Sequence, residues 1–204
     1  MEQMIDNQDQ ENSRTAHEQE TIQFPAGTWI IDQSRSTVAF SVRHLLISTV
    51  RGHFDVFSGM IITSGSPIGT SVEAYAEVAT LQTGDSARDI FILSRELLDT
   101  ERWPRMWMKG EVTGETSTRY ILDTEMCIRD VVRPVQFDVA LDDTSTRERY
   151  RDPSNIGRVT LHARATVNRK DFGLEFSPIL ESGGIIVADT VDLRLDVSAI
   201  FDHP

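Results

Sequence analysis

Apolar and polar residues alternate with a period of two along most of the chain from Trp29 onward. A β-strand with one buried and one exposed face produces this pattern, because its successive side chains point to opposite sides. The clearest runs cover residues 37–42, 72–78, 135–142, 159–167 and 191–198. Parallel strands are buried on both faces and are apolar throughout, so this repeated alternation indicates an antiparallel sheet.

Turn-forming residues separate these runs, and we expect about eight or nine strands, several longer than the usual five or six residues. The expected strands cover 28–32, 35–43, 48–64, 71–80, 105–115, 119–128, 131–143, 156–168 and 186–199. A sheet of long strands tends to curl and close, which removes its exposed edges. The prediction is therefore an all-β fold, a closed antiparallel barrel, with a flat two-sheet sandwich as the alternative.

One segment interrupts the strand pattern and predicts a short amphipathic helix. Asp85 follows Thr83-Gly84 and can cap the start of a helix, and Pro104 prevents its continuation. The apolar face at helical spacing would consist of Ala87, Ile90, Phe91, Leu97 and Leu98. We expect this helix to close one end of the barrel, either as a lid on the core or as one wall of a ligand mouth.

Residues 1–23 have few apolar side chains, with no periodicity, and one arginine, Arg14. The acidic residues of this segment are Glu2, Asp6, Asp9, Glu11, Glu18 and Glu20. Such a segment buries too little apolar surface to offset its ordering entropy. We expect a disordered acidic tail before a barrel domain over 24–204, and the alternative is a tail that folds on contact with a protein partner.

The net charge of −12 argues against sequence-independent binding to nucleic acid and against electrostatic docking on an anionic membrane. The chain contains no apolar run of about 18 residues, which a membrane-spanning helix would need. Its first residues have neither the basic nor the apolar part of a secretory signal, so we expect a cytoplasmic protein. Cys127 is the single cysteine and cannot form an intramolecular disulfide.

Seven sequence blocks follow one another in a fixed order. They are Trp29-Ile-Ile-Asp32 through His44, Val50-Arg51-Gly52-His-Phe54 with Phe57-Ser-Gly59, Leu81-Gln-Thr83-Gly84 with Arg88-Asp89, Leu98-Asp99 with Trp103-Pro104, Ile128-Arg129 through Pro134-Val135, Asp152-Pro153 with Arg158, and Asn168-Arg169 through Phe172-Gly173-Leu174. In this order they resemble the YceI-like family, the bacterial lipocalin-like polyisoprenoid-binding proteins. The resemblance covers about residues 28–199.

This resemblance implies a lipocalin-like barrel of eight strands with an elongated apolar cavity. It also implies binding of long isoprenoid or similar lipid-like molecules without a metal or cofactor. The chain departs from the family pattern at Phe91, where His is frequent, at Asp130, where Gly is usual, and at Ser154, where an aromatic residue is usual. Phe91 would make such a cavity drier or fill part of it.

An eight-stranded barrel is just wide enough to be filled by side chains or to hold one small ligand. Small residues at Ala74, Ala76, Ala163 and Ala165 fall on the apolar faces of expected strands and leave room for a ligand. The apolar candidates for ligand contact are Phe40, Val42, Phe54, Phe57, Phe91, Leu98, Trp103, Met106, Met108, Phe172 and Phe176. The alternative for each is ordinary core packing.

A diphosphate head group would need arginine forks or backbone amides. Arg51, between Val50 and Gly52, and Arg169, shortly before Phe172-Gly173, are the first candidates. Each could instead form an ordinary surface or structural ion pair.

Motifs for metal binding and catalysis are absent from the sequence. The histidines show neither His-x-His nor His-Glu-x-x-His spacing, and neither a Gly-x-Ser-x-Gly elbow nor a phosphate-binding loop occurs. We expect no catalytic residue, no metal and no cofactor, and the predicted function is a binding or carrier protein for an apolar molecule. The alternative is a cofactor-independent cyclase or isomerase acting on an apolar polyene in the same cavity.

The expected partner is an isoprenoid, a quinone or a fatty-acid-like molecule, with no nucleic acid and no membrane insertion, and a homodimer is left open. A weaker possibility is that the acidic tail recruits a protein and the barrel is only a scaffold.

Overall fold

The computed structural model describes residues 25–44, 48–116, 119–142, 157–175 and 187–202. The strands are β1 (Gly27–Ile31), β2 (Thr37–His44), β3 (Ser48–Phe54), β4 (Phe57–Thr63), β5 (Ser71–Glu77), β6 (Leu81–Gln82), β7 (Arg105–Glu115), β8 (Tyr120–Ile128), β9 (Val131–Leu141), β10 (Arg158–Asn168) and β11 (Val187–Phe201). The helix α1 covers Ser86–Leu93, and short 3-10 turns lie at Gln33–Arg35, Val78–Thr80 and Arg169–Phe172. The predicted tail at 1–23 falls outside the described residues.

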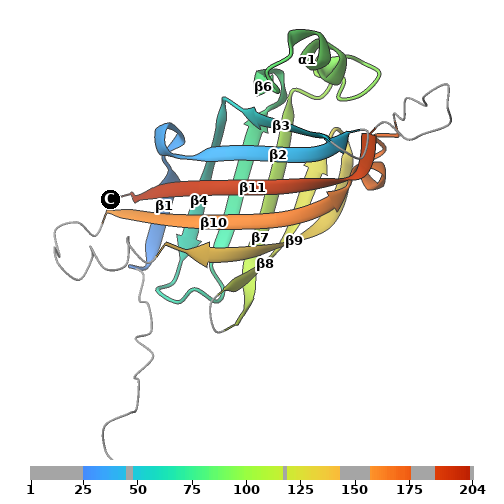
Figure 1. Cartoon of the computed structure of the whole chain (residues 1–204). Coiled ribbons are helices and arrows are strands. Elements are labelled where there is room, and N and C mark those ends of the chain that lie inside the picture. The colour runs from blue at the N-terminus through green and yellow to red at the C-terminus, as the bar shows by residue number, and fades with distance from the viewer. Residues whose placement is uncertain (1–24, 45–47, 117–118, 143–156, 176–186, 203–204) are drawn as a thin grey trace, which may run out of the picture.

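All strand pairs are antiparallel and the sheet closes on itself (Figure 1). Strands β1 and β2 both pair with β11, so together they act as one bent strand. Strands β3 and β4 form a second bent strand, in which β4 pairs with β1 and β3 pairs with β2. Strands β5 and β6 form a third, in which β5 pairs with β4 and β6 pairs with β3. Counted with these three bent strands, the eleven segments form a closed barrel of eight strands. The predicted barrel is confirmed, and the two-sheet sandwich is wrong.

The bend between β1 and β2 is fixed by Asp32, which lies between the two strands. Its side chain accepts a hydrogen bond from the Ser34 amide at 3.1 Å and pairs with Arg158 of β10 at 2.7 Å. Its backbone N–H donates to the carbonyl oxygen of Ser198 in β11. These contacts join the bend to the neighbouring strands, so the first strand changes direction without leaving the barrel wall.

The core consists of the inward-facing residues of the alternating strands. Phe137 on β9 is fully buried, and it packs in one cluster with Phe172 and with Leu122 of β8. Trp29 is 1% exposed and meets Phe201 edge-on, with the ring centroids 5.1 Å apart. Phe137 lies on the face that period-two alternation assigned to the interior, whereas Phe172 reaches the core from the turn Arg169–Phe172.

Helix α1 lies at one end of the barrel, as Figure 1 shows. Asp85 caps it through the Arg88 amide at 3.1 Å, as the sequence predicted. The helix ends at Leu93, because Ser94 takes an extended conformation and its hydroxyl bonds the carbonyl oxygen of Phe91. The predicted apolar face was wrong at Ile90, which lies within α1 and is 72% exposed, and at Leu97 and Leu98, which lie beyond its end. Among the described residues, no helix has the length and apolar character needed to cross a membrane.

Candidate ligand cavity

An apolar cavity of about 360 Å³ lies beneath α1, and we call it the helix-end cavity. It is lined by Phe40, Val42, His44, Val50, Phe54, Leu81, Arg88, Phe91, Ile92, Leu97, Leu98, Met106, Ile128, Val167, Arg169, Leu174, Val187, Val191 and Leu193. Its walls are therefore mainly aliphatic and aromatic, with a few polar groups, which is the usual composition of a small-molecule site.

Gly52 on β3 helps to shape this cavity because it has no side chain. A Cβ atom at this position would meet the ring of Phe40 and would lie 2.9 Å from the carbonyl oxygen of Gln82. The ring of Phe40 therefore lies against the β3 backbone, and it meets Phe54 with the ring centroids 5.9 Å apart. The absence of a side chain at Gly52 therefore gives the Phe40 ring its place at the cavity wall.

Two arginines line the helix-end cavity, and both make hydrogen bonds to the protein. Arg88 donates from Nε to the Thr83 hydroxyl at 2.8 Å and from Nη2 to the Thr83 carbonyl at 2.9 Å. Arg169 is 7% exposed, donates to the carbonyl oxygens of Ala188 and Leu174, and pairs with Asp189 at 2.9 Å. These bonds fix both guanidinium groups at the cavity wall.

Asp189 receives both Arg169 and Lys170, and the Lys170 hydrogen bond followed by the positive charges of Lys170 and Arg169 lowers the pKa of its carboxyl. The carboxylate stays ionised around neutral pH and ties the turn Arg169–Phe172 to β11. A structural role for Arg169 is therefore established by its contacts, whereas its predicted contact with a ligand head group stays a prediction.

Two smaller spaces continue the interior away from α1. The central space, of about 130 Å³, shares Phe40, Phe54, Met106, Ile128 and Leu193 with the helix-end cavity. The far space, of about 110 Å³, shares Ile31, Ala74, Met108, Leu195 and Val197 with the central space. Because neighbouring spaces have walls in common, the three follow one another along the barrel.

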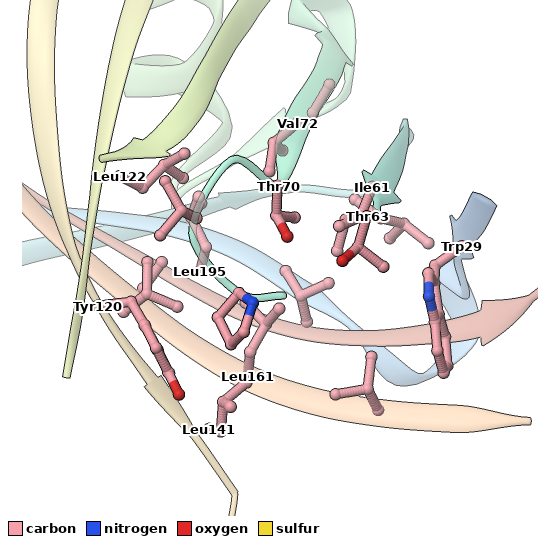
Figure 2. A pocket seen from close by; sticks show the side chains of 18 of the residues that line it. Trp29, Ile61, Thr63, Thr70, Val72, Tyr120, Leu122, Leu141, Leu161 and Leu195 are labelled. Atoms are coloured by element: carbon pink, nitrogen blue, oxygen red, sulfur yellow. The ribbon is translucent and has the colours of Figure 1, made fainter. Parts of the chain in front are cut away.

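The far space is lined by side chains from strands on all sides, as Figure 2 shows for Trp29, Val72, Leu122, Leu161 and Leu195. The loop between β4 and β5 also contributes Pro67 to its lining. The hydroxyls of Thr63 and Thr70 both donate to the Ser66 carbonyl, at 3.0 and 2.9 Å, and so hold this loop in place.

Among the described residues that line the far space, Tyr120 is the one phenol. Burial, with a smaller contribution from Glu115, raises the pKa of the Tyr120 hydroxyl, so this group is a neutral donor at physiological pH.

Most of the predicted site residues come together around this interior. Phe40, Val42, Phe54, Phe91, Leu98, Met106 and Arg169 line the helix-end cavity, and Phe57 and Met108 line the central space. Trp103 and Phe172 line none of the three spaces: Phe172 is packed in the core, and Trp103 lies beneath the guanidinium of Arg102. Phe176 falls outside the described residues.

Arg51 lies on the outer face of the barrel, because Val50, Gly52 and Phe54 take the inward positions of β3. It lines a polar surface hollow together with Arg164, Arg194 and several acidic residues. Its position gives no support to the predicted head-group contact.

Several residues that line the cavity were not predicted from the sequence, although the alternation of apolar and charged residues indicated the inward position of some of them. Val191 and Leu193 alternate on β11 with charged residues, so they could have been assigned to the cavity. Ile92 could not, because its contact depends on where α1 ends. Arg88 belongs to the sequence block at the helix entry, and that block gives no sign of a position at the cavity.

Comparison with known proteins agrees with this architecture. The family model described as YceI-like domain matches residues 29–199. UPF0312 protein SA2479 of Staphylococcus aureus (strain N315) is 25% identical over 173 residues, which cover 83% of this chain and 94% of that protein.

Solved structures share the fold at low sequence identity. The crystal structure of Burkholderia cenocepacia BcnA gives a TM-score of 0.68 at 15% identity, covering 82% of this chain and 98% of that one. A polyisoprenoid binding domain from Saccharophagus degradans, described as implicated in plant cell wall breakdown, gives 0.61 at 15% identity, covering 85% and 98%. The YCEI protein of Campylobacter jejuni gives 0.62 at 17% identity, covering 79% and 90%. Since the family model spans most of its length, the chain belongs to the YceI-like family.

Proposed function

We propose that this protein binds and carries one apolar molecule of the isoprenoid, quinone or fatty-acid type inside its barrel. The observation that carries the proposal is the series of three neighbouring apolar spaces that share lining residues along the interior, the largest of them about 360 Å³. A long apolar chain would fill such a series of spaces and would gain hydrophobic free energy along its whole length.

The structural neighbour from Saccharophagus degradans supports the ligand class, since it is described as a polyisoprenoid binding domain. We place the polar head of the ligand at the helix end, beside Arg88 and Arg169, where the guanidinium groups lie. The apolar chain would then extend toward Trp29 in the far space.

The enzyme alternative needs an acid–base pair at the bound substrate. The linings of the three spaces, as far as the structure describes them, contain His44 but no carboxylate. This composition supports binding over acid–base chemistry.

The test is a titration of the full-length protein with farnesol, read by displacement of a fluorescent apolar dye. Val42→Trp places an indole in the helix-end cavity and should weaken farnesol binding about tenfold or more, because the added volume takes the place of the ligand. The matched control is Arg43→Trp, since Arg43 is the exposed neighbour that points to the other face of β2, and it should change binding by less than about twofold. The absence of saturable binding to the wild-type protein, or equal effects of the two variants, would overturn the proposal.

A further inference from the structure

The three spaces meet at two junctions, and different residues line each junction. The helix-end cavity and the central space meet at Phe40, Phe54 and Met106, and we call this first junction the upper neck. The central and far spaces meet at Ile31, Ala74, Met108, Leu195 and Val197, and we call this second junction the lower neck. Met106 lines the upper neck and Val112 lines the far space, six residues further along β7. At the rise per residue of an extended strand, the two positions are about 20 Å apart.

Each neck contains one methionine from β7. Met106 and Met108 are two residues apart and both face the interior, because side chains alternate along the strand. A methionine side chain is unbranched and polarizable, and it fits gaps of different shape more easily than a branched residue does. Both necks can therefore adjust to a chain that passes through them.

The lower neck has one small side chain, Ala74, among larger ones. Ala74 on β5 lies directly opposite Met108 on β7 and opposite Gly59 on β4. A Cβ atom at position 59 would lie 2.8 Å from Cδ1 of Ile31 and 2.9 Å from Cβ of Ala74, so Ile31 packs directly onto the β4 backbone. Ile31 therefore fills the place of a side chain at Gly59, and within the lower neck Ala74 is the smallest side chain, facing the adaptable Met108.

We propose that this lower neck determines how long an apolar chain the barrel accepts, with Ala74 and Met108 as the residues that set the limit. The inference rests on the proposed function and assigns its specificity. A short chain stays in the helix-end cavity, which Ala74 does not line. A longer chain passes Ala74 and Met108 and ends in the far space against Trp29 and Pro67.

The experiment uses geraniol, farnesol and geranylgeraniol, which differ only in the number of isoprene units, as competitors for a fluorescent apolar dye. Each buried methylene contributes roughly fourfold in affinity, so an added isoprene unit that finds a place should tighten binding by more than about tenfold. Wild-type protein should show this gain along the series. Ala74→Phe should bind geraniol within about twofold of wild type and should lose about tenfold or more for the longest member.

Ala140→Phe is the matched control, because Ala140 lies on the outward face of β9 and lines none of the three spaces. It should keep the wild-type gain along the series. Ala74→Leu is the second variant if the phenylalanine destabilises the barrel. It should also weaken binding of the longest alcohol selectively, by a smaller factor than Ala74→Phe. If wild type binds the series and neither Ala74 variant changes its length dependence, the inference is wrong while the proposed function stands. If wild type binds none of the three alcohols, the proposed function fails and the inference fails with it.

Discussion

Gly52→Ala tests the packing that shapes the helix-end cavity. The new methyl group would lie 2.7 Å from Cε1 of Phe40, closer still to its Cζ, and 2.9 Å from the Gln82 carbonyl oxygen. The ring of Phe40 can rotate away, but Gln82 is paired with His53 next to the glycine, so the backbone of β6 must shift as well. Overpacking of this kind typically costs about 1–3 kcal/mol, and we expect that loss in the free energy of unfolding.

The assay is urea unfolding followed by circular dichroism at constant pH, with the free energy taken from linear extrapolation. A double-mutant cycle with Phe40→Leu separates the two clashes, because the leucine removes the ring and leaves the Gln82 contact. The double variant should be more stable than the sum of the two single losses by about 1 kcal/mol. Strict additivity, or a Gly52→Ala variant as stable as wild type, would refute the close approach of Phe40 to the β3 backbone.

Two further predictions follow from the backbone and the charges. Arg129 in the β8–β9 turn has a φ of 60°, so Arg129→Gly should raise the free energy of unfolding by about 1 kcal/mol, measured by thermal melting, whereas Asp130→Gly should give no such gain. The Ser34 hydrogen bond, followed by Arg158, lowers the pKa of Asp32 from its ordinary value of 3.8. The stability that Asp32 contributes is then fully present above that value and is lost as the pH falls through the lower folded-state value. Asp32→Asn should therefore flatten the acid side of the stability profile below about pH 4, and an unchanged profile would contradict this linkage.

The barrel itself could be predicted because period-two alternation reports directly on burial. Val135, Phe137 and Val139 are buried while Gln136 and Asp138 are exposed, as the pattern required. The expected single strand over 48–64 was wrong, because the chain bends at Asp55 and Val56. That bend depends on long-range bonds, among them the Asp55 amide to the Thr80 carbonyl, which no local pattern encodes.

The candidate site was predicted less well than the fold. The outward position of Arg51 could have been deduced from the alternation of Val50 and Phe54 on the same strand. The environment of Arg169 could not, since it depends on Leu174, Ala188 and Asp189, which are brought together by the turn and by β11. The early end of α1 at Ser94, where a serine hydroxyl caps the last turn, leaves Leu97 and Leu98 beyond the helix.

The most direct test of the central claim is native mass spectrometry of the freshly purified full-length protein, followed by denaturing extraction and analysis of the released molecules. The protein is first incubated with geranylgeraniol and the excess is removed. We predict one apolar molecule per chain, from the cell or from the added alcohol, retained in the native spectrum and released on unfolding. A native spectrum with only the unliganded mass after this loading would contradict the claim that the barrel holds an apolar ligand.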